Sequence, residues 1–172
     1  MNTSIVLTVI AKDQPGIIKT VSSALKNHGG NWTQSSMSSL AGQFAGILLA
    51  SVPTQNTEAC LAELRALESL GLHIVVEACE DETLPESSDE FSLELVGNDH
   101  PGIVHNITTI LANHQVSVHD LETSVESASM AGGEVFRANA LLQVPKSTDI
   151  SDLEAELEDI ANDLMVDINL KR

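Results

Sequence analysis

The sequence predicts an α+β protein of two similar domains, each with the element order β-α-β-β-α-β. The peptide KDQPGII at residues 12–18 returns as NDHPGIV at residues 98–104, each time after an apolar run. The segments that follow the two copies change between helical and strand periodicity in the same order. Because 172 residues are enough for two small domains, the repeat indicates a duplicated unit.

Each half opens with a strand and a helix. Strands are predicted at 4–11 (SIVLTVIA) and 90–97 (EFSLELVG), where apolar and β-branched residues dominate. After each Pro-Gly turn, apolar residues recur with the spacing of one helix face: Ile17, Val21, Ala24 and Leu25, then Ile103, Ile107, Ile110 and Leu111. Gly29-Gly30 is expected to end the first helix. The second helix is expected to end at Asn113 or His114, in a less favourable left-handed cap.

A hairpin, a second helix and a last strand complete each half. The predicted hairpins, 31–53 and 116–145, turn at Ala41-Gly42 and at Ala131-Gly132-Gly133. Helices are predicted at 57–70 and at about 148–163, with Thr57 and either Thr148 or Ser151 as their caps. The final strands are predicted at 72–78 and 164–170.

Right-handed crossovers would place both helices of a unit on one face of its antiparallel sheet. This arrangement is the ferredoxin-like two-layer sandwich. The predicted domains are 1–79 and 91–172. The segment 80–90 between them is acidic, contains Pro and Ser and has no apolar pattern, so it is predicted to be a linker.

Charge and targeting signals exclude several classes of partner. The chain has 25 acidic and 8 basic side chains and a formal net charge of -17. Such a surface repels polyanions, so neither nucleic acid nor an anionic membrane is expected to bind directly. No apolar run approaches the roughly 20 residues of a membrane span, and the N-terminus lacks the pattern of a secretory signal. A cytoplasmic protein is therefore expected, with Cys60 and Cys79 as small buried hydrophobes.

Catalysis has little support in the sequence. No phosphate-binding Walker loop, GxSxG, HExxH or Cys-x-x-Cys motif is present, so the chain is not expected to be an enzyme or to need a cofactor. The histidines of the second half, His100, His105, His114 and His119, do not share a helix face and have no Cys or clustered Asp beside them. Structural roles are therefore favoured over a metal site.

The repeated turn has the chemistry of an amino-acid site. Both copies contain Asp, Pro and Gly in the same places: Asp13, Pro15 and Gly16, then Asp99, Pro101 and Gly102. The proline suits the first helical turn, and the glycine lets a ligand approach the backbone. Free N–H groups at the helix start favour a carboxylate, and the aspartate could accept a hydrogen bond from an ammonium group. In the alternative interpretation the aspartate only caps the helix, and the turn binds nothing.

The segments IAKDQPGIIKTVSSALKNHGGN and VGNDHPGIVHNITTILANHQVS, in this frame, resemble the ACT domain, a small regulatory module that binds amino acids. The resemblance covers nearly the whole chain. It implies a small amino acid as ligand, with glycine or serine as the first candidates. It also implies that Asn31 lines the first site, where Ser117 stands in the second copy. The candidate ligand-binding residues are Lys12, Asp13, Gln14, Pro15, Gly16, Ile17 and Asn31, and Asn98, Asp99, His100, Pro101, Gly102 and Ile103.

Two functions remain open at this point. Tandem ACT units without a catalytic domain resemble transcriptional regulators of glycine cleavage genes; this resemblance implies an amino-acid-responsive regulator that would hold a DNA-binding activator rather than DNA. The alternative is a regulatory subunit that docks to an amino-acid-metabolising enzyme and controls it. A homodimer is implied by the resemblance alone. Because only the first copy combines Lys12, a glycine pair and Asn31, the first turn is expected to bind the ligand more tightly.

Overall fold

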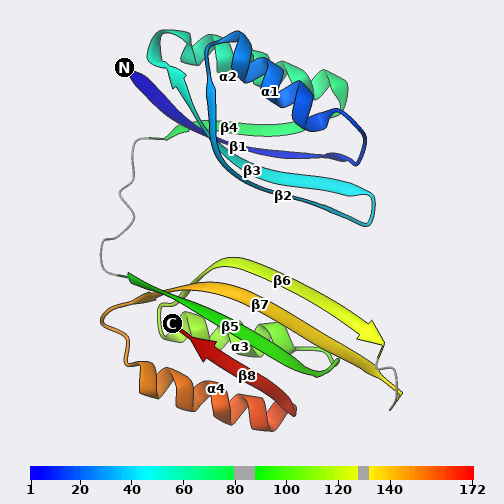
Figure 1. Ribbon diagram of the computed structural model, residues 1–172, viewed down its shortest axis with the longest axis vertical. Helices are drawn as coiled ribbons and strands as arrows, with labels where there is room; N and C mark the ends of the chain where they lie inside the picture. The colour runs from blue at the N-terminus through cyan, green and yellow to red at the C-terminus, as the bar shows by residue number, and fades with distance from the viewer. Residues whose placement is uncertain (80–87, 128–131) are drawn as a thin grey trace. The chain divides into compact units, whose positions relative to one another are not determined.

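The computed structural model describes residues 1–79, 88–127 and 132–172. The chain divides into two compact units, Met1–Thr83 and Leu84–Arg172. In each unit, two helices cover one face of a four-stranded antiparallel sheet (Figure 1). The predicted α+β class and the order β-α-β-β-α-β are therefore confirmed. None of the helices in the described residues is long and apolar enough to cross a membrane.

The first unit has the strand order β2-β3-β1-β4, with β1 and β3 in the centre. Its elements are β1 (Asn2–Lys12), α1 (Ile17–Asn27), β2 (Asn31–Leu40), β3 (Gln43–Pro53), α2 (Thr57–Ala66) and β4 (His73–Cys79). Short 3₁₀ turns at Thr54–Asn56 and Leu67–Leu70 flank α2. The helix predicted over 57–70 is thus α-helical only to Ala66.

The second unit repeats this topology with the strand order β6-β7-β5-β8. Its elements are β5 (Ser88–Asn98), α3 (Ile103–Asn113), β6 (Ser117–Ser127), β7 (Glu134–Pro145), α4 (Ile150–Leu164) and β8 (Val166–Lys171). Residues 88–90 belong to β5 and not to the predicted linker, because they pair with the end of β7. The other predicted linker residues, 80–87, and the predicted turn residue Ala131 lie outside the described residues.

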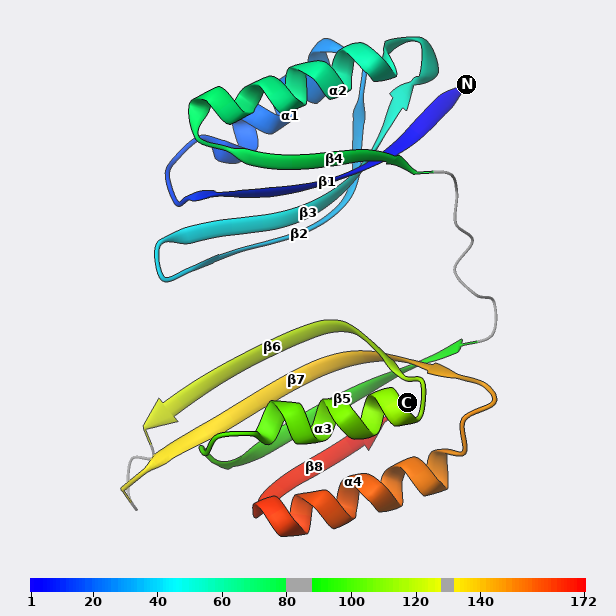
Figure 2. The same ribbon diagram turned by 180° about the vertical axis from the view of Figure 1, so that it is seen from behind.

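Each unit has its own apolar core between the sheet and the helices (Figure 2). Alternate residues of the central strand enter the core: Ile5, Leu7 and Val9 are fully buried. The predicted stripe of α1 is buried in full, whereas Ile110 of the α3 stripe is only partly buried. Cys60 is buried as expected, and burial raises the pKa of its thiol, whereas Cys79, also predicted to be buried, is half-buried.

The first helices of both units end in the same backbone motif. In α1, the N–H groups of Gly30 and Gly29 donate to the carbonyls of Leu25 and Lys26, and Gly29 has a φ of 71°. In α3 the motif is completed by Gln115, with a φ of 59°. The prediction of a left-handed residue at Asn113 or His114 was therefore wrong by one or two positions. A non-glycine residue in this conformation is strained by about 1–2 kcal/mol.

The cap predictions for the second helices need correction. Thr57 lies inside α2, which has no side-chain cap. At α4, neither Thr148 nor Ser151 is the cap, since the Asp149 carboxylate accepts hydrogen bonds from the N–H groups of Ser151 and Asp152 at 2.9 and 3.3 Å. Thr148 precedes the N-cap residue Asp149. Its hydroxyl instead donates a hydrogen bond to the His114 carbonyl.

A histidine at the end of each first helix meets a glutamate of the second helix. The Nε2 atom of His28 lies 2.7 Å from the Glu63 carboxylate, which also accepts a hydrogen bond from Asn27 at 2.9 Å. In the second unit, His114 and Glu156 approach to 3.3 Å. The hydrogen bond from Asn27, followed by that with His28, lowers the pKa of Glu63 below its ordinary value of 4.5. These contacts join the two helices of a unit at one end.

Exchanging the residues of the two left-handed helix ends should shift stability in opposite directions. We expect Gly29→Ala to destabilise the first unit by about 1 kcal/mol. Gln115→Gly should stabilise the second by up to about 1 kcal/mol, because relief of strain exceeds the entropy that glycine loses on folding. Urea unfolding measures both effects, with Trp32 fluorescence reporting the first unit. Equal losses in the two variants would contradict the assignment.

The contacts of Glu63 should make the first unit less stable in acid. Because its pKa is lower in the folded state, this contribution is complete above pH 4.5 and is lost as the pH falls through the folded pKa. The stability difference between the wild type and Glu63→Gln should therefore be largest near neutrality and shrink below pH 4.5. Urea unfolding at a series of pH values checks this, and a difference independent of pH would contradict it.

Candidate functional site

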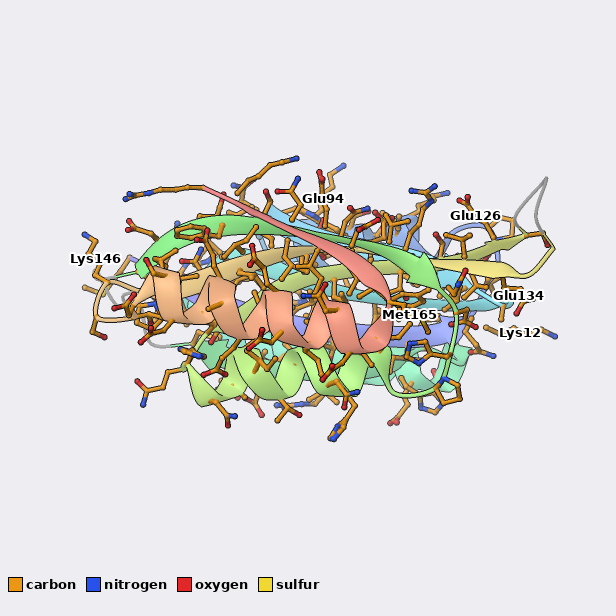
Figure 3. The ribbon with its side chains drawn as sticks, turned by 90° about the horizontal axis from the view of Figure 1, so that it is seen from below. Lys12, Glu94, Glu126, Glu134, Lys146 and Met165 are labelled. Atoms are coloured by element: carbon orange, nitrogen blue, oxygen red, sulfur yellow. The ribbon has the colours of Figure 1, made fainter. Side chains whose placement is uncertain are left out.

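In both units the repeated turn joins the central strand to the first helix, beside the start of the third strand, β3 or β7 (Figure 1). The Asp13 N–H donates to the Gly42 carbonyl at 2.9 Å, and the Asp99 N–H donates to the Glu134 carbonyl at the same distance. Figure 3 labels Glu134 together with Glu126 from the neighbouring strand of this hairpin. The backbone of the hairpin thus fixes where each aspartate lies.

A glycine in a left-handed conformation starts each helix. Gly16 and Gly102 have φ values of 99° and 98° and occupy the N-cap positions. A Cβ atom on Gly16 would meet nothing within 4 Å, so the backbone conformation, and not a close neighbour, requires glycine here. Pro15 and Pro101 precede these caps. Their predicted placement in the first helical turn was wrong, because the left-handed glycine comes between the proline and the helix.

The aspartates do not cap the helices. Neither α1 nor α3 has a side-chain cap or an acidic residue in its first turn. The Asp13 carboxylate instead accepts a hydrogen bond of 2.6 Å from the Ser39 hydroxyl on β2. Each turn therefore combines an exposed carboxylate with N–H groups that no side chain caps.

The structure separates some of the predicted site residues. Lys12 pairs with Gln43, whereas Asn31 pairs with Ser51, eight residues further along β3. Asn31 is thus about 25 Å from the turn, since a strand rises about 3.3 Å per residue. Ser117 is equally remote in the second unit, because it pairs with Gln143 whereas Asn98 pairs with Val135. Within one unit, neither Asn31 nor Ser117 lies at the turn.

The remaining predicted residues stay together at the turn, with different exposures. Lys12, Asp13, Gln14, Pro15 and Gly16 are exposed, as are Asn98, Asp99, Pro101 and Gly102; His100 is half-buried, and Ile17 and Ile103 are buried. Alternation along the strand directs Lys12 away from the helices, whereas Asp13 reaches Ser39 on the helix side. The two charges of the first turn therefore do not face one place.

The second turn is tied down differently. The ring nitrogens of His100 lie 3.2 Å from the carbonyl oxygens of Pro101 and of Leu164, the last residue of α4. At the position of Ser39, the second unit has Val125, because Val125 pairs with Phe136 as Ser39 pairs with Phe44. Asp99 consequently lacks the hydroxyl that holds Asp13.

Ser39 is the site residue that sequence reasoning missed. The signal was present in the two-residue turn Ala41-Gly42, which fixes the register of β2 against β3 and so places Ser39 at the turn end of the sheet. The contact of His100 with α4 had no comparable signal, because it joins residues 64 positions apart.

An apolar cavity of about 30 Å³ lies between α3 and the sheet of the second unit, lined by Leu95, Ile103, Ile107, Leu111, Leu121 and Phe136 among others. It offers no polar partner to a zwitterion and is too small for one. Within the residues that the structure describes, no group of His, Cys, Asp and Glu is placed to hold a metal ion.

The sequence matches the ACT domain family twice, over residues 3–77 and over residues 91–171. The chain belongs to the ACT domain family. ACT domains are regulatory modules that bind small ligands such as amino acids, so the chain is an ACT-domain regulatory protein. No curated protein matches the sequence at a significant level.

Two solved structures resemble both ACT domains together. One is an unknown protein from Galdieria sulphuraria, with a TM-score of 0.89 and 28% identity over 99% of this chain and 98% of that chain. The other is named "putative glycine cleavage system transcriptional repressor", with a TM-score of 0.68 and 19% identity over 99% and 97% of the two chains. At 19% identity, the similarity to the second structure shows that the two chains share a fold, and no more.

The left-handed glycine of the first ACT turn should be sensitive to its replacement by alanine. We expect Gly16→Ala to destabilise the first domain by about 1–2 kcal/mol through backbone strain alone, since space for the methyl group is free. Gly16→Asn should cost less, because asparagine tolerates this conformation. Unfolding followed by Trp32 fluorescence compares the two variants. An asparagine variant no more stable than the alanine variant would contradict this explanation.

Proposed function

We propose that this chain is an amino-acid-responsive regulator of transcription that acts on glycine cleavage genes by holding a DNA-binding activator. The observation that carries the amino-acid part is the turn: a carboxylate, Asp13, stands beside the uncapped N-terminus of α1. The helix N–H groups suit a ligand carboxylate, and Asp13 suits a ligand ammonium group. Residues 12–16 of this turn are exposed, so a small amino acid such as glycine or serine can reach it from solvent.

The transcriptional part of the proposal has separate support. The fold of this chain, with its two ACT domains, extends over 97% of the chain of the protein named as a putative glycine cleavage system transcriptional repressor. A net charge of -17 opposes direct contact with DNA. A repressor of this charge therefore needs a protein intermediary, and an activator with a basic DNA-binding surface has the complementary charge.

The first turn is the better candidate for the ligand. The Ser39 hydroxyl holds the Asp13 carboxylate in place, whereas the equivalent position near Asp99 is Val125. The imidazole of His100 also connects the second turn to the end of α4, which leaves it less free to close on a ligand. We therefore expect unequal affinities at the two turns.

Calorimetric titration with glycine and with serine tests the ligand site. Asp13→Ala should weaken binding at least about tenfold, since a charge-assisted hydrogen bond contributes about 1.5–3 kcal/mol. Asp99→Ala should weaken binding less, and Ser39→Ala should fall between the two. Asp149→Ala is the matched control, because it removes a carboxylate that caps α4 and should reduce stability by about 1 kcal/mol without changing affinity.

Other outcomes of this titration would contradict the assignment. Equal losses of affinity in the two aspartate variants would mean equivalent sites, and a larger loss at Asp99 would place the working site in the second domain.

A gel-shift assay tests the partner: this chain should change the mobility of the target DNA only when the activator is also present. Salt-sensitive binding of the purified chain alone to that DNA would overturn the proposal, and capture of a metabolic enzyme instead of an activator would favour the enzyme-docking alternative.

A further inference from the structure

The sheet face that the helices leave open is apolar in the first domain. Ile10, Ile47 and Val75 are 53%, 50% and 64% exposed. Ile47 and Val75 both pair with Thr8, from the strands on its two sides. We call this surface the Thr8 face; its central side chains are Val6, Thr8, Ile10, Ile47, Leu49 and Val75.

The corresponding face of the second domain is polar. Glu94 takes the place of Thr8, because it pairs with Asn139 of β7 and Asn169 of β8. Asn139 and Asn169 therefore stand where the first domain has Ile47 and Val75. Lys171 forms an ion pair of 3.0 Å with Glu94, which is labelled in Figure 3. The same fold thus tolerates water on this face, and the first domain has apolar residues where the second has polar ones.

The Thr8 face also carries few charges for so acidic a chain. In residues 1–79, all of which the structure describes, the titratable side chains on this face are Lys12, Glu77 and His73, as alternation along the strands and the pairing of His73 with Ile10 show. Lys12 and Glu77 lie on opposite sides of the Thr8 row, since Lys12 pairs with Gln43 and Glu77 pairs with Val6. Exposed apolar surface of this kind marks a contact site.

We propose that the Thr8 face is an interface through which two copies of this chain associate, sheet against sheet. Two sheets pack in this way with interdigitated apolar side chains about 10 Å apart. A two-fold axis near Thr8 brings Lys12 of each copy toward Glu77 of the other, so the face is complementary to itself in charge as well as in polarity. A nucleic acid or a basic protein would find little charge to bind here.

The net charge of -17 explains why association would use this face. Two copies repel each other, and the repulsion is least where the approaching surfaces are neutral.

The area of the Thr8 face sets the strength of the association. Four strands about 4.8 Å apart and seven residues of about 3.3 Å cover roughly 450 Å² on each copy. A pair buries roughly 1,000 Å², near the lower limit for specific interfaces, so the dimer should dissociate in the micromolar range.

Sedimentation equilibrium over a concentration series tests the proposal. The wild type should form dimers, more tightly at high salt, because screening weakens the repulsion and leaves the apolar contact intact. The double variant Ile47→Asn, Val75→Asn carries the residues of the second domain and should raise the dimer dissociation constant at least about tenfold. Thr8→Glu places like charges opposite each other and should act in the same direction. Circular dichroism and Trp32 fluorescence verify that each variant is folded.

Val125→Asn is the matched control, because Val125 is an exposed, β-branched strand residue, 49% accessible, outside the Thr8 face. It should leave the dimer unchanged. A wild type that stays monomeric at every concentration overturns the proposal. So does a folded Thr8→Glu variant that dimerises as well as the wild type, or a dimer that only Val125→Asn disrupts.

Discussion

The alternation of the central strand is the constraint on which the rest of each domain depends. Ile5, Leu7 and Val9 are fully buried against the helices, and each such side chain contributes about 1.5–3 kcal/mol to folding. Right-handed crossovers bring both helices to this one face, so the other face remains uncovered. The same geometry starts α1 at the end of the sheet where the hairpin turns. Both the position of the repeated turn and the open Thr8 face thus follow from one buried row of side chains.

The two domains share their backbone contacts and differ in their exposed side chains. Both aspartates donate their N–H to the hairpin, and both first helices end in the same hydrogen-bonded motif. These contacts are fixed by packing. Exposed positions are not fixed by packing. At two of them, Thr8 of the first domain corresponds to Glu94 of the second, and Ser39 corresponds to Val125. Divergence at such positions lets one fold perform two tasks within a chain.

The errors of sequence reasoning have physical causes. The resemblance to the ACT domain placed Asn31 beside the first turn, but an α-helix of 11 residues and its turn carry the chain to the opposite end of the sheet, so within one unit Asn31 lies far from that turn. Asp13 matched the chemistry of a helix cap, yet the left-handed Gly16 separates it from the helix and the Ser39 hydroxyl takes its carboxylate. The cap of α4 was misplaced because several adjacent polar residues could serve, and the backbone geometry selects Asp149, whereas α2 has no side-chain cap at all.

The sequence by itself determined the duplicated fold, the course of the strands and helices, and the repeated turn. These features depend on periodicity and on Gly and Pro, which act over a few neighbouring residues. Tertiary structure alone decided that Ser39 holds Asp13, that His100 reaches Leu164, and that Ile47, Thr8 and Val75 form one surface. Each of these groupings joins distant segments through strand register or helix packing. The register of a strand pair depends on how both strands and their turn fit together, so it cannot be deduced from one segment of sequence.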